Sequence, residues 1–313
     1  MAPEQTMPRA ARNPRMREVV GDDSPAVHRL LTGQQRDFVG SRAAFTLSTA
    51  PPMNVAPIPT APTWRVVATS ATGRRHRQQL QPCQDAVRWV STPGGLLLAA
   101  VADGAGSAPC GEAGATTAVT AALAALTANA DTGATLGADT PARALLRLAI
   151  DAALQSLRQA AGLRQAALGE YATTLLVCVA GTDGVAAAQI GDGAVLVGTA
   201  PDRLETLTQP AAGEYLNETV FLTSEGALDR LQTAFWTGRA RHVALFSDGL
   251  QMLALKMPGA VPHLPFFQPL WAWLSRLEDL EAGQRELLAT LGSARFSERT
   301  DDDLTLLLAE RRE

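Results

Sequence analysis

Four apolar segments of this sequence carry aspartate at one end, and this repeated pattern constrains the fold more than any other feature. Three of them finish in Asp-Gly, with the acids at Asp103, Asp192 and Asp248. In the fourth the order is reversed, because the acids at 301–303 run directly into LTLLL. Such positions lie where a buried strand meets a loop, and a rigid scaffold can hold oxygen ligands there. The pattern predicts carboxylates gathered at the ends of buried strands.

These acids need something to offset their mutual repulsion. Three adjacent carboxylates beside a core strand are unfavourable unless a cation lies among them. A single Asp-Gly pair is usually only a turn. Four acidic strand ends instead suit a hard divalent cation such as Mg²⁺ or Mn²⁺, which prefers carboxylate and carbonyl oxygens, and no histidine or cysteine cluster competes for that role. We therefore expect a divalent metal site, with a set of solvated turns as the alternative.

Composition excludes several classes of protein. The 313 residues are 46% hydrophobic with a formal net charge of -4, which suits one large domain or two smaller ones and gives no general attraction to nucleic acid or anionic lipid. Cys83, Cys110 and Cys178 have no paired spacing, so neither a disulfide framework nor a zinc site is expected. No stretch is apolar for the length that a membrane span needs. We predict a cytoplasmic protein that binds neither nucleic acid nor membrane.

The sequence divides into two parts. Residues 1–62 are rich in proline and arginine and are predicted to be a flexible arm, whereas residues 63–313 are predicted to fold. Strands are predicted at 63–70, 86–91, 95–103, 172–180, 185–191, 194–199, 241–248 and 304–309, the second and third forming a hairpin. Helices are predicted at 112–130, 141–163, 267–277 and 282–291. Runs of strands interrupted by blocks of helices indicate the α+β class.

Six short motifs follow one another along the chain: CQDA at 83–86, VADGAGS at 101–107, ATTLL at 172–176, QIGDGAVL at 189–196, LFSDGL at 245–250 and DDLTLLL at 302–308. In this order they resemble the motif series of the metal-dependent serine/threonine protein phosphatases of the PP2C family, over about residues 64–311. The segment GEYLNETVFLT at 213–223 is similar to one in the bacterial PP2C-like subgroup. The resemblance implies an α+β fold with two antiparallel β-sheets packed as a central sandwich flanked by helices.

The resemblance also implies an activity, the hydrolysis of phosphoserine and phosphothreonine in proteins, opposing a Ser/Thr kinase. It makes Asp103 the carboxylate that bridges two Mn²⁺ or Mg²⁺ ions, with the Gly104 carbonyl as a further ligand. Asp248 and Asp302 complete the ligands of the first ion, and Asp85 lies by the second ion, mostly through water. Such ions activate a bridging water for attack on phosphorus, so no nucleophilic cysteine or serine is required.

Two departures from the family pattern bear on catalysis. Gln84 stands where many relatives have glutamate, which removes one negative charge near the second ion and lowers its expected affinity. Ala105 stands where eukaryotic members have a histidine. A metal-bound water or His76 would then have to protonate the leaving group.

Three further acids differ in what the resemblance implies for them. Asp192 matches an acid that helps to hold a third ion in some members, but Met252 replaces its usual partner, which argues against a third ion. Asp303 replaces a usual asparagine, and its extra charge either offsets Gln84 or faces water. Asp301 is expected to be only solvated.

A phosphate substrate also needs a cation to meet it. The segment GRRHRQQ precedes the first motif, in the loop where the family keeps a phosphate-binding arginine. Because a guanidinium fork suits phosphate, Arg75 and Arg77 are candidates, and His76 is a third. A solvated basic loop is the alternative.

Two points stay open at this stage. Asn217 and Glu218 are candidate substrate-binding residues from the bacterial-subgroup segment, with an ordinary loop as the alternative. The substitutions Gln84, Ala105 and Met252 also leave a second functional hypothesis, in which the chain is a catalytically weak regulatory or phosphoprotein-binding module that kept the fold.

Overall fold

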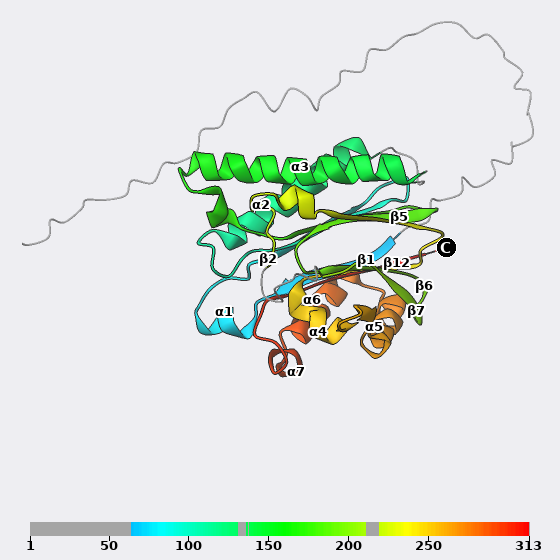
Figure 1. Cartoon of the computed structure of the whole chain (residues 1–313). Coiled ribbons are helices and arrows are strands. Elements are labelled where there is room, and N and C mark those ends of the chain that lie inside the picture. The colour runs from blue at the N-terminus through cyan, green and yellow to red at the C-terminus, as the bar shows by residue number, and fades with distance from the viewer. Residues whose placement is uncertain (1–63, 131–135, 137, 211–218, 313) are drawn as a thin grey trace, which may run out of the picture. The chain divides into compact units, whose positions relative to one another are not determined.

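Two five-stranded antiparallel β-sheets lie face to face, and helices cover the outer surface of each (Figure 1). This computed structural model describes residues 64–130, 136, 138–210 and 219–312. The predicted α+β class and the sandwich of two antiparallel sheets flanked by helices are both confirmed. The predicted N-terminal arm lies outside the described residues, and so do the candidates Asn217 and Glu218.

All predicted strands are present and are divided between the two sheets. The first sheet has the order β1-β12-β9-β6-β7 and consists of β1 (Trp64–Ala71), β6 (Ala194–Ala200), β7 (Arg203–Thr208), β9 (His242–Phe246) and β12 (Leu304–Arg311). The second sheet has the order β2-β3-β4-β5-β8 and consists of β2 (Asp85–Ser91), β3 (Leu97–Asp103), β4 (Leu175–Ala180), β5 (Gly184–Ile190) and β8 (Gln232–Thr237). A separate short ribbon pairs β10 (Leu255–Lys256) with β11 (Val261–Pro262).

Four long helices match the four predicted ones. They are α2 (Gly111–Asn129) and α3 (Asp139–Leu163) over the second sheet, and α5 (Leu264–Arg276) and α6 (Leu280–Leu291) over the first (Figure 1). The short helices are α1 (Arg74–Gln78), α4 (Gln251–Ala254) and α7 (Ala294–Ser297), with 3₁₀ turns η1 (Leu168–Tyr171), η2 (Ala227–Arg230) and η3 (Asp248–Leu250). The sequence pattern does not predict the short helices, because elements of this length show no periodicity and depend on tertiary contacts. No helix among the described residues is long and apolar enough to cross a membrane.

Three apolar layers result from this arrangement. One lies between the sheets, one lies under α2 and α3, and one lies under α5 and α6. Successive residues of β3 alternate between the inter-sheet layer (Leu97, Ala99 and Val101) and the layer under α2 and α3 (Leu98, Ala100 and Ala102). Because both faces of β3 are covered, its sequence is continuously apolar until Asp103, as expected for a strand buried on both sides.

The acidic strand ends meet at one end of the sandwich, where the strands lead into loops. In the second sheet, the first residue of β2, Asp85, pairs with the last residue of β3, Asp103. In the first sheet, Asp248 follows β9 and Asp302 precedes β12, which are antiparallel neighbours. The topology therefore places carboxylates from both sheets close to each other.

Candidate active site

Asp85 and Asp103 lie opposite each other on adjacent strands. Directly opposed side chains have Cβ atoms about 4.5–5.5 Å apart, where like charges are destabilising. Burial, followed by the charges of Asp85 and Asp248, raises the pKa of Asp103 well above its usual range. The pairing of β2 with β3 therefore sets two acids side by side, with Asp248 close enough to affect the pKa of Asp103.

Asp85 also joins the two sheets. Its Oδ2 accepts hydrogen bonds from Ser247 Oγ and from Thr305 Oγ1, each at 2.7 Å. Ser247 directly follows β9, and Thr305 lies at the start of β12, so both donors belong to the first sheet. Its Oδ1 is buried and has no hydrogen-bond partner. Burial raises the pKa of Asp85 to about 7, with the charges of Asp303 and Asp248 adding to the effect. One oxygen of this carboxylate is thus fixed, and the other is available to a ligand.

Asp248, Asp192 and Asp302 extend the cluster from the first sheet and its turns. Burial, followed by the neighbouring charge of Asp192, raises the pKa of Asp248 to about 6. The pKa of Asp192 is raised by burial, while its Oδ2 accepts a 2.6 Å hydrogen bond from Thr219 Oγ1. The charge of Asp302 contributes to the raised pKa of each of the other two. The structure therefore brings the predicted acids together.

The donor set fits a hard divalent cation. Asp85 Oδ1 and Asp248 Oδ1 are both buried acceptors without a hydrogen-bond partner, which is the condition that a bound cation would relieve. As they stand, no three Asp, Glu, His or Cys side chains of the described residues are close enough to hold an ion by themselves. Backbone carbonyls and water commonly complete sites for Mg²⁺, so fewer than three side chains can suffice.

Gly104 follows Asp103 and is closely packed. A Cβ atom there would lie 2.3 Å from the carbonyl oxygen of Gly111 at the start of α2, so no other residue fits without moving backbone. Gln84, which replaces the usual glutamate, lies beside it, and with its amide oriented to satisfy the surrounding groups its nitrogen donates to the carbonyls of Gly104 and Ala105 at 3.1 Å and 3.2 Å. A glutamate could not donate these hydrogen bonds. Gln84 therefore holds the loop that follows Asp103.

The three basic candidates of α1 have different surroundings. The guanidinium of Arg75 lies against the loop after Asp103, since a Cβ on Gly106 would be 2.5 Å from Arg75 Nη2. His76 is 2% exposed, and its Nδ1 lies 2.9 Å from Asp303 Oδ2, although not at a hydrogen-bonding angle. Arg77 turns back to donate to the carbonyl of Thr72. Arg75 is thus the candidate whose guanidinium lies against the loop that follows Asp103.

Asp303 does not face water, which corrects one of the two alternatives for this residue. It is 2% exposed, and its two carboxylate oxygens accept hydrogen bonds from the backbone of Gly73 and Gln84, both at 2.6 Å. The neighbouring Asp301 is exposed but pairs with Arg74 at 2.5 Å, so the expectation that it is only solvated was wrong. Asp303 ties α1 and the start of β2 to the start of β12.

Comparison with known proteins identifies the family. The family model described as Protein phosphatase 2C matches residues 72–292. This chain belongs to the protein phosphatase 2C family. Over 252 residues this phosphatase 2C chain is 40% identical to "Serine/threonine-protein phosphatase 3" of Escherichia coli (strain K12), with 79% of this chain and 98% of that protein covered.

Solved structures share the phosphatase 2C fold at lower identity. The serine/threonine phosphatase Stp1 from Staphylococcus aureus has a TM-score of 0.55 and 18% identity, covering 81% of this chain and 97% of that one. The Mycobacterium tuberculosis serine/threonine phosphatase PstP/Ppp has a TM-score of 0.54 and 18% identity, covering 80% and 99%. The phosphatase 2C chain is a protein-serine/threonine phosphatase, and the hypothesis of a catalytically weak binding module is not favoured.

Sequence reasoning on this phosphatase 2C chain missed the residues that support the acids. Ser247 and Thr305 fix Asp85, and both lie within the quoted motifs, in FSDG and DDLT. Each is a hydroxyl residue close in sequence to an acid at a strand end, and this pattern could have predicted their role. The role of Asp303 had no such signal, because its partners Gly73 and Gln84 lie more than 200 residues earlier.

Asp303 and Asp301, two residues apart, should differ sharply in their contribution to stability. Asp303→Ala leaves two buried backbone N–H groups unsatisfied and removes the partner of His76, so we expect a loss of about 3–5 kcal/mol in the free energy of unfolding. Asp301→Ala removes an exposed pair with Arg74 and should cost less than about 1 kcal/mol. Urea denaturation measures both. Equal losses, or a small loss for Asp303→Asn and Asp303→Ala alike, would contradict the role of Asp303.

Proposed function

We propose that this serine/threonine phosphatase acts with two divalent ions, Mn²⁺ or Mg²⁺, bound at the acid cluster. Asp103, the Gly104 carbonyl, Asp248 and Asp302 would hold the first ion, with Asp103 shared by the second. Asp85 would lie by the second ion through water. The supporting observation is a buried cluster of carboxylates from both sheets that includes two unpaired acceptor oxygens. When bound, such ions activate water and neutralise charge on the phosphoryl group.

The chain's own residues orient the substrate. Arg75 lies beside the loop after Asp103 and has no carboxylate partner among the described residues, so its guanidinium can donate two parallel hydrogen bonds to phosphoryl oxygens. The backbone N–H of Arg75 donates to the carbonyl of Asp301 at 3.0 Å, which fixes the start of α1 beside the acid cluster. A preset arginine of this kind reduces the entropy lost when phosphate binds.

His76 remains the side-chain candidate for protonating the leaving group. Its Nε2 points toward Gly106, since a Cβ there would lie 3.9 Å away, and its Nδ1 faces Asp303. This arrangement holds the ring with one nitrogen toward the loop of Asp103. His76 is only 2% exposed, so its side chain also packs α1 against the rest of the fold. This burial supports a role in holding α1 in place as well as a role in proton transfer.

The partner and compartment are also proposals. The substrate would be a phosphorylated protein, either a Ser/Thr kinase or a target of one. Cytoplasmic location is supported by three free cysteines, Cys83, Cys110 and Cys178, of which Cys178 is fully buried. A third ion at Asp192 is not proposed, because Met252 is 76% exposed and offers no oxygen.

The function can be tested with a phosphothreonine peptide. We expect hydrolysis that requires Mn²⁺ or Mg²⁺, and Asp103→Asn should lower kcat by at least about 100-fold, because that carboxylate would help to hold the ions that activate water. Phosphate release measures the rate, and circular dichroism confirms that the variant folds. Turnover that is independent of metal, or absent in a folded parent protein, would overturn the proposal.

Metal affinity should depend on pH. Carboxylates must lose their protons to bind a cation, and the pKa values of Asp85 and Asp248 are raised to about 7 and about 6. Protons therefore compete below these values, and apparent Mn²⁺ affinity should rise at least about tenfold from pH 5.5 to pH 7.5. Titration calorimetry measures this rise. Asp248→Asn should weaken binding at both pH values, and unchanged affinity in that variant would count against the ligand set.

Arg75 and Arg77 form a matched pair of variants on one helix. Arg75→Gln should lower kcat/KM for a phosphopeptide by about 10- to 100-fold, because a charge-assisted contact to phosphate is lost. Arg77→Gln should change kcat/KM by less than about threefold, because its side chain turns to the carbonyl of Thr72. Inhibition by inorganic phosphate provides a second measurement. A larger effect for Arg77→Gln would assign the phosphate contact to that residue instead.

A further inference from the structure

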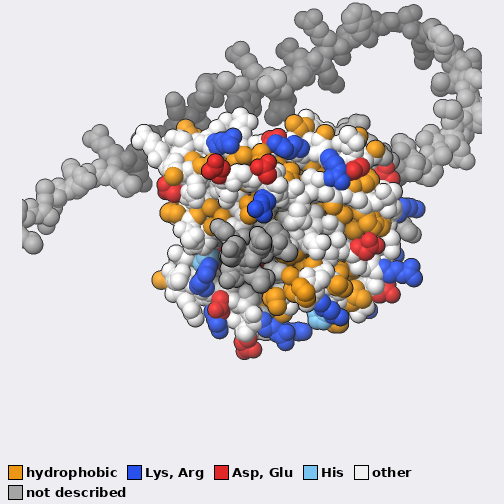
Figure 2. All heavy atoms as spheres, in the orientation of Figure 1, with side chains coloured by type: hydrophobic (Ala, Val, Ile, Leu, Met, Phe, Trp, Pro, Cys, Tyr) orange, Lys and Arg blue, Asp and Glu red, His pale blue; other side chains and the backbone are white. Residues whose placement is uncertain are grey.

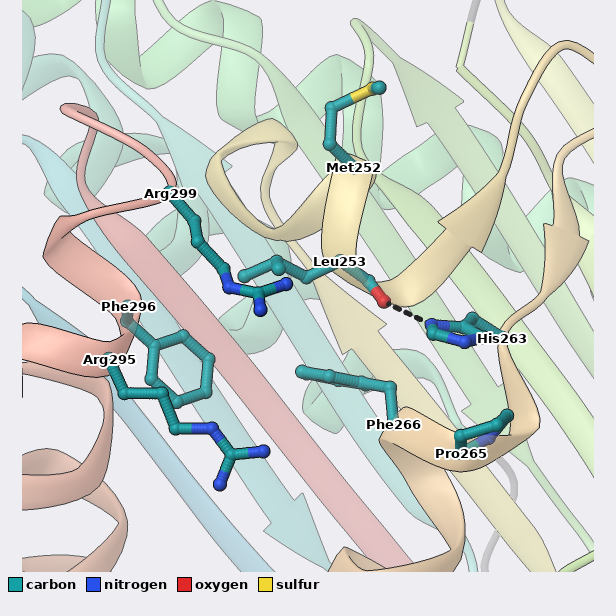
Figure 3. A pocket seen from close by; sticks show the side chains of 8 residues that line it. All are labelled: Met252, Leu253, His263, Pro265, Phe266, Arg295, Phe296 and Arg299. Atoms are coloured by element: carbon teal, nitrogen blue, oxygen red, sulfur yellow. Dashed lines mark hydrogen bonds between the residues drawn. The ribbon is translucent and has the colours of Figure 1, made fainter.

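A pocket on the outer side of the first sheet contains no group used in the proposed mechanism. It has a volume of about 240 Å³. Three segments line it: α4 (Met252 and Leu253), the start of α5 (His263, Pro265 and Phe266), and α7 with the turn after it (Arg295, Phe296 and Arg299) (Figure 3). It is therefore assembled from parts of the chain far apart in sequence.

The pocket combines apolar walls with two cations. The rings of Phe266 and Phe296 lie edge to face, with centroids 6.4 Å apart, and both arginines extend from the α7 side (Figure 3). No carboxylate lines it, and neither guanidinium has a hydrogen-bond or ion-pair partner within the described part of the chain. His263 is fixed to the Leu253 carbonyl through Nδ1 at 3.1 Å. A complementary ligand is apolar and carries a negative charge.

The pocket lies close to the predicted metal ligands along the chain. Met252 comes four residues after Asp248, through one turn of helix, which is about 6–8 Å of rise. Arg299 comes three residues before Asp302, at most about 11 Å away. An extended peptide advances about 3.3 Å per residue. A peptide whose phosphorylated residue is at the acid cluster can thus place a side chain two to four residues away in this pocket.

Size and surroundings favour a side chain over a free cofactor. Small-molecule sites usually enclose about 300–1,000 Å³, and this pocket is smaller. Met252, which lines the pocket, is 76% exposed. Met257 and Val261, in the segment between α4 and α5, are also exposed, by 40% and 55%. Apolar side chains also gather over the region of α4 and α5 in Figure 2. Flexible methionines adapt to different apolar partners.

We propose that this pocket selects the phosphoprotein substrate by accepting a bulky apolar side chain next to a carboxylate, two to four residues from the phosphorylated residue. The apolar side chain packs against the rings of Phe266 and Phe296, and the carboxylate pairs with Arg295 or Arg299. The inference rests on the proposed phosphatase function and adds the local sequence that the enzyme prefers.

Phosphothreonine peptides test this preference. One set carries Leu-Asp at each position from two to four residues before or after the phosphothreonine, and a matched set carries Ala-Lys there. We expect kcat/KM to favour one Leu-Asp peptide by about tenfold. Phe296→Ala and Arg299→Gln should each remove most of this preference while leaving hydrolysis of p-nitrophenyl phosphate unchanged, because that ester does not reach the pocket. Arg285→Gln, on the exposed face of α6, is the control and should change neither.

The outcomes separate the pocket from the catalytic function. Ester hydrolysis with no peptide preference, or a preference unaffected by Phe296→Ala and Arg299→Gln, overturns the pocket proposal alone. Binding of a labelled peptide, followed by fluorescence anisotropy, covers the other case: Arg299-dependent binding without any hydrolysis overturns the function and supports the pocket. A concentration-dependent dimer that Phe296→Ala disrupts would show that a second copy occupies the pocket, and would overturn its role in substrate selection.

Discussion

The carboxylate of Asp303 is the interaction on which the arrangement of the active site depends. Its two oxygens accept the backbone N–H groups of Gly73 and Gln84, which begin α1 and precede β2, while its own backbone starts β12. Three segments that are distant in sequence thus meet at one buried negative charge, with His76 beside it. Because hydrogen bonds to an ionised group are stronger than neutral ones, this single side chain fixes the relative positions of Arg75, Asp85 and Asp302.

The same region concentrates charge that the core would otherwise exclude. Asp85, Asp103, Asp192 and Asp248 all have pKa values raised first by burial, so their ionised forms are unfavourable without a counter-charge. Asp85 is buried and the other three are half-buried, at the ends of fully buried strands such as β3 and β9. A scaffold stabilised by apolar burial can carry such a cluster, and perturbed acids in one place are typical of functional sites.

Much of this organisation could be predicted from the sequence, for physical reasons. Length and periodicity in the sequence predict long apolar strands such as β3 and long helices such as α3. Aspartates at the ends of apolar segments predict the candidate site. What could not be predicted depends on contacts across the fold. The side-chain directions of Arg75 and Arg77, which are two residues apart, are set by Gly106 and Thr72, and sequence spacing gives no information on them.

The departures from the family pattern also need the fold to be interpreted. In the sequence, Gln84 means the loss of a glutamate charge. In the structure, its amide group donates hydrogen bonds to the carbonyls of Gly104 and Ala105. In the sequence, Asp303 adds a charge where the family usually has asparagine. In the structure, its carboxylate oxygens accept hydrogen bonds from two backbone N–H groups. Both residues act through the hydrogen bonds that their particular head groups can make.

The hydrogen bonds from Ser247 and Thr305 to Asp85 have a mechanical consequence. They cross from one sheet to the other, so a sliding displacement of the two sheets by even one or two ångströms would break both. Shear between the layers, a common way for packed elements to move, is therefore opposed at the edge where the acids meet. The two hydrogen bonds thus act to hold Asp85 of the second sheet at a fixed spacing from the acids of the first.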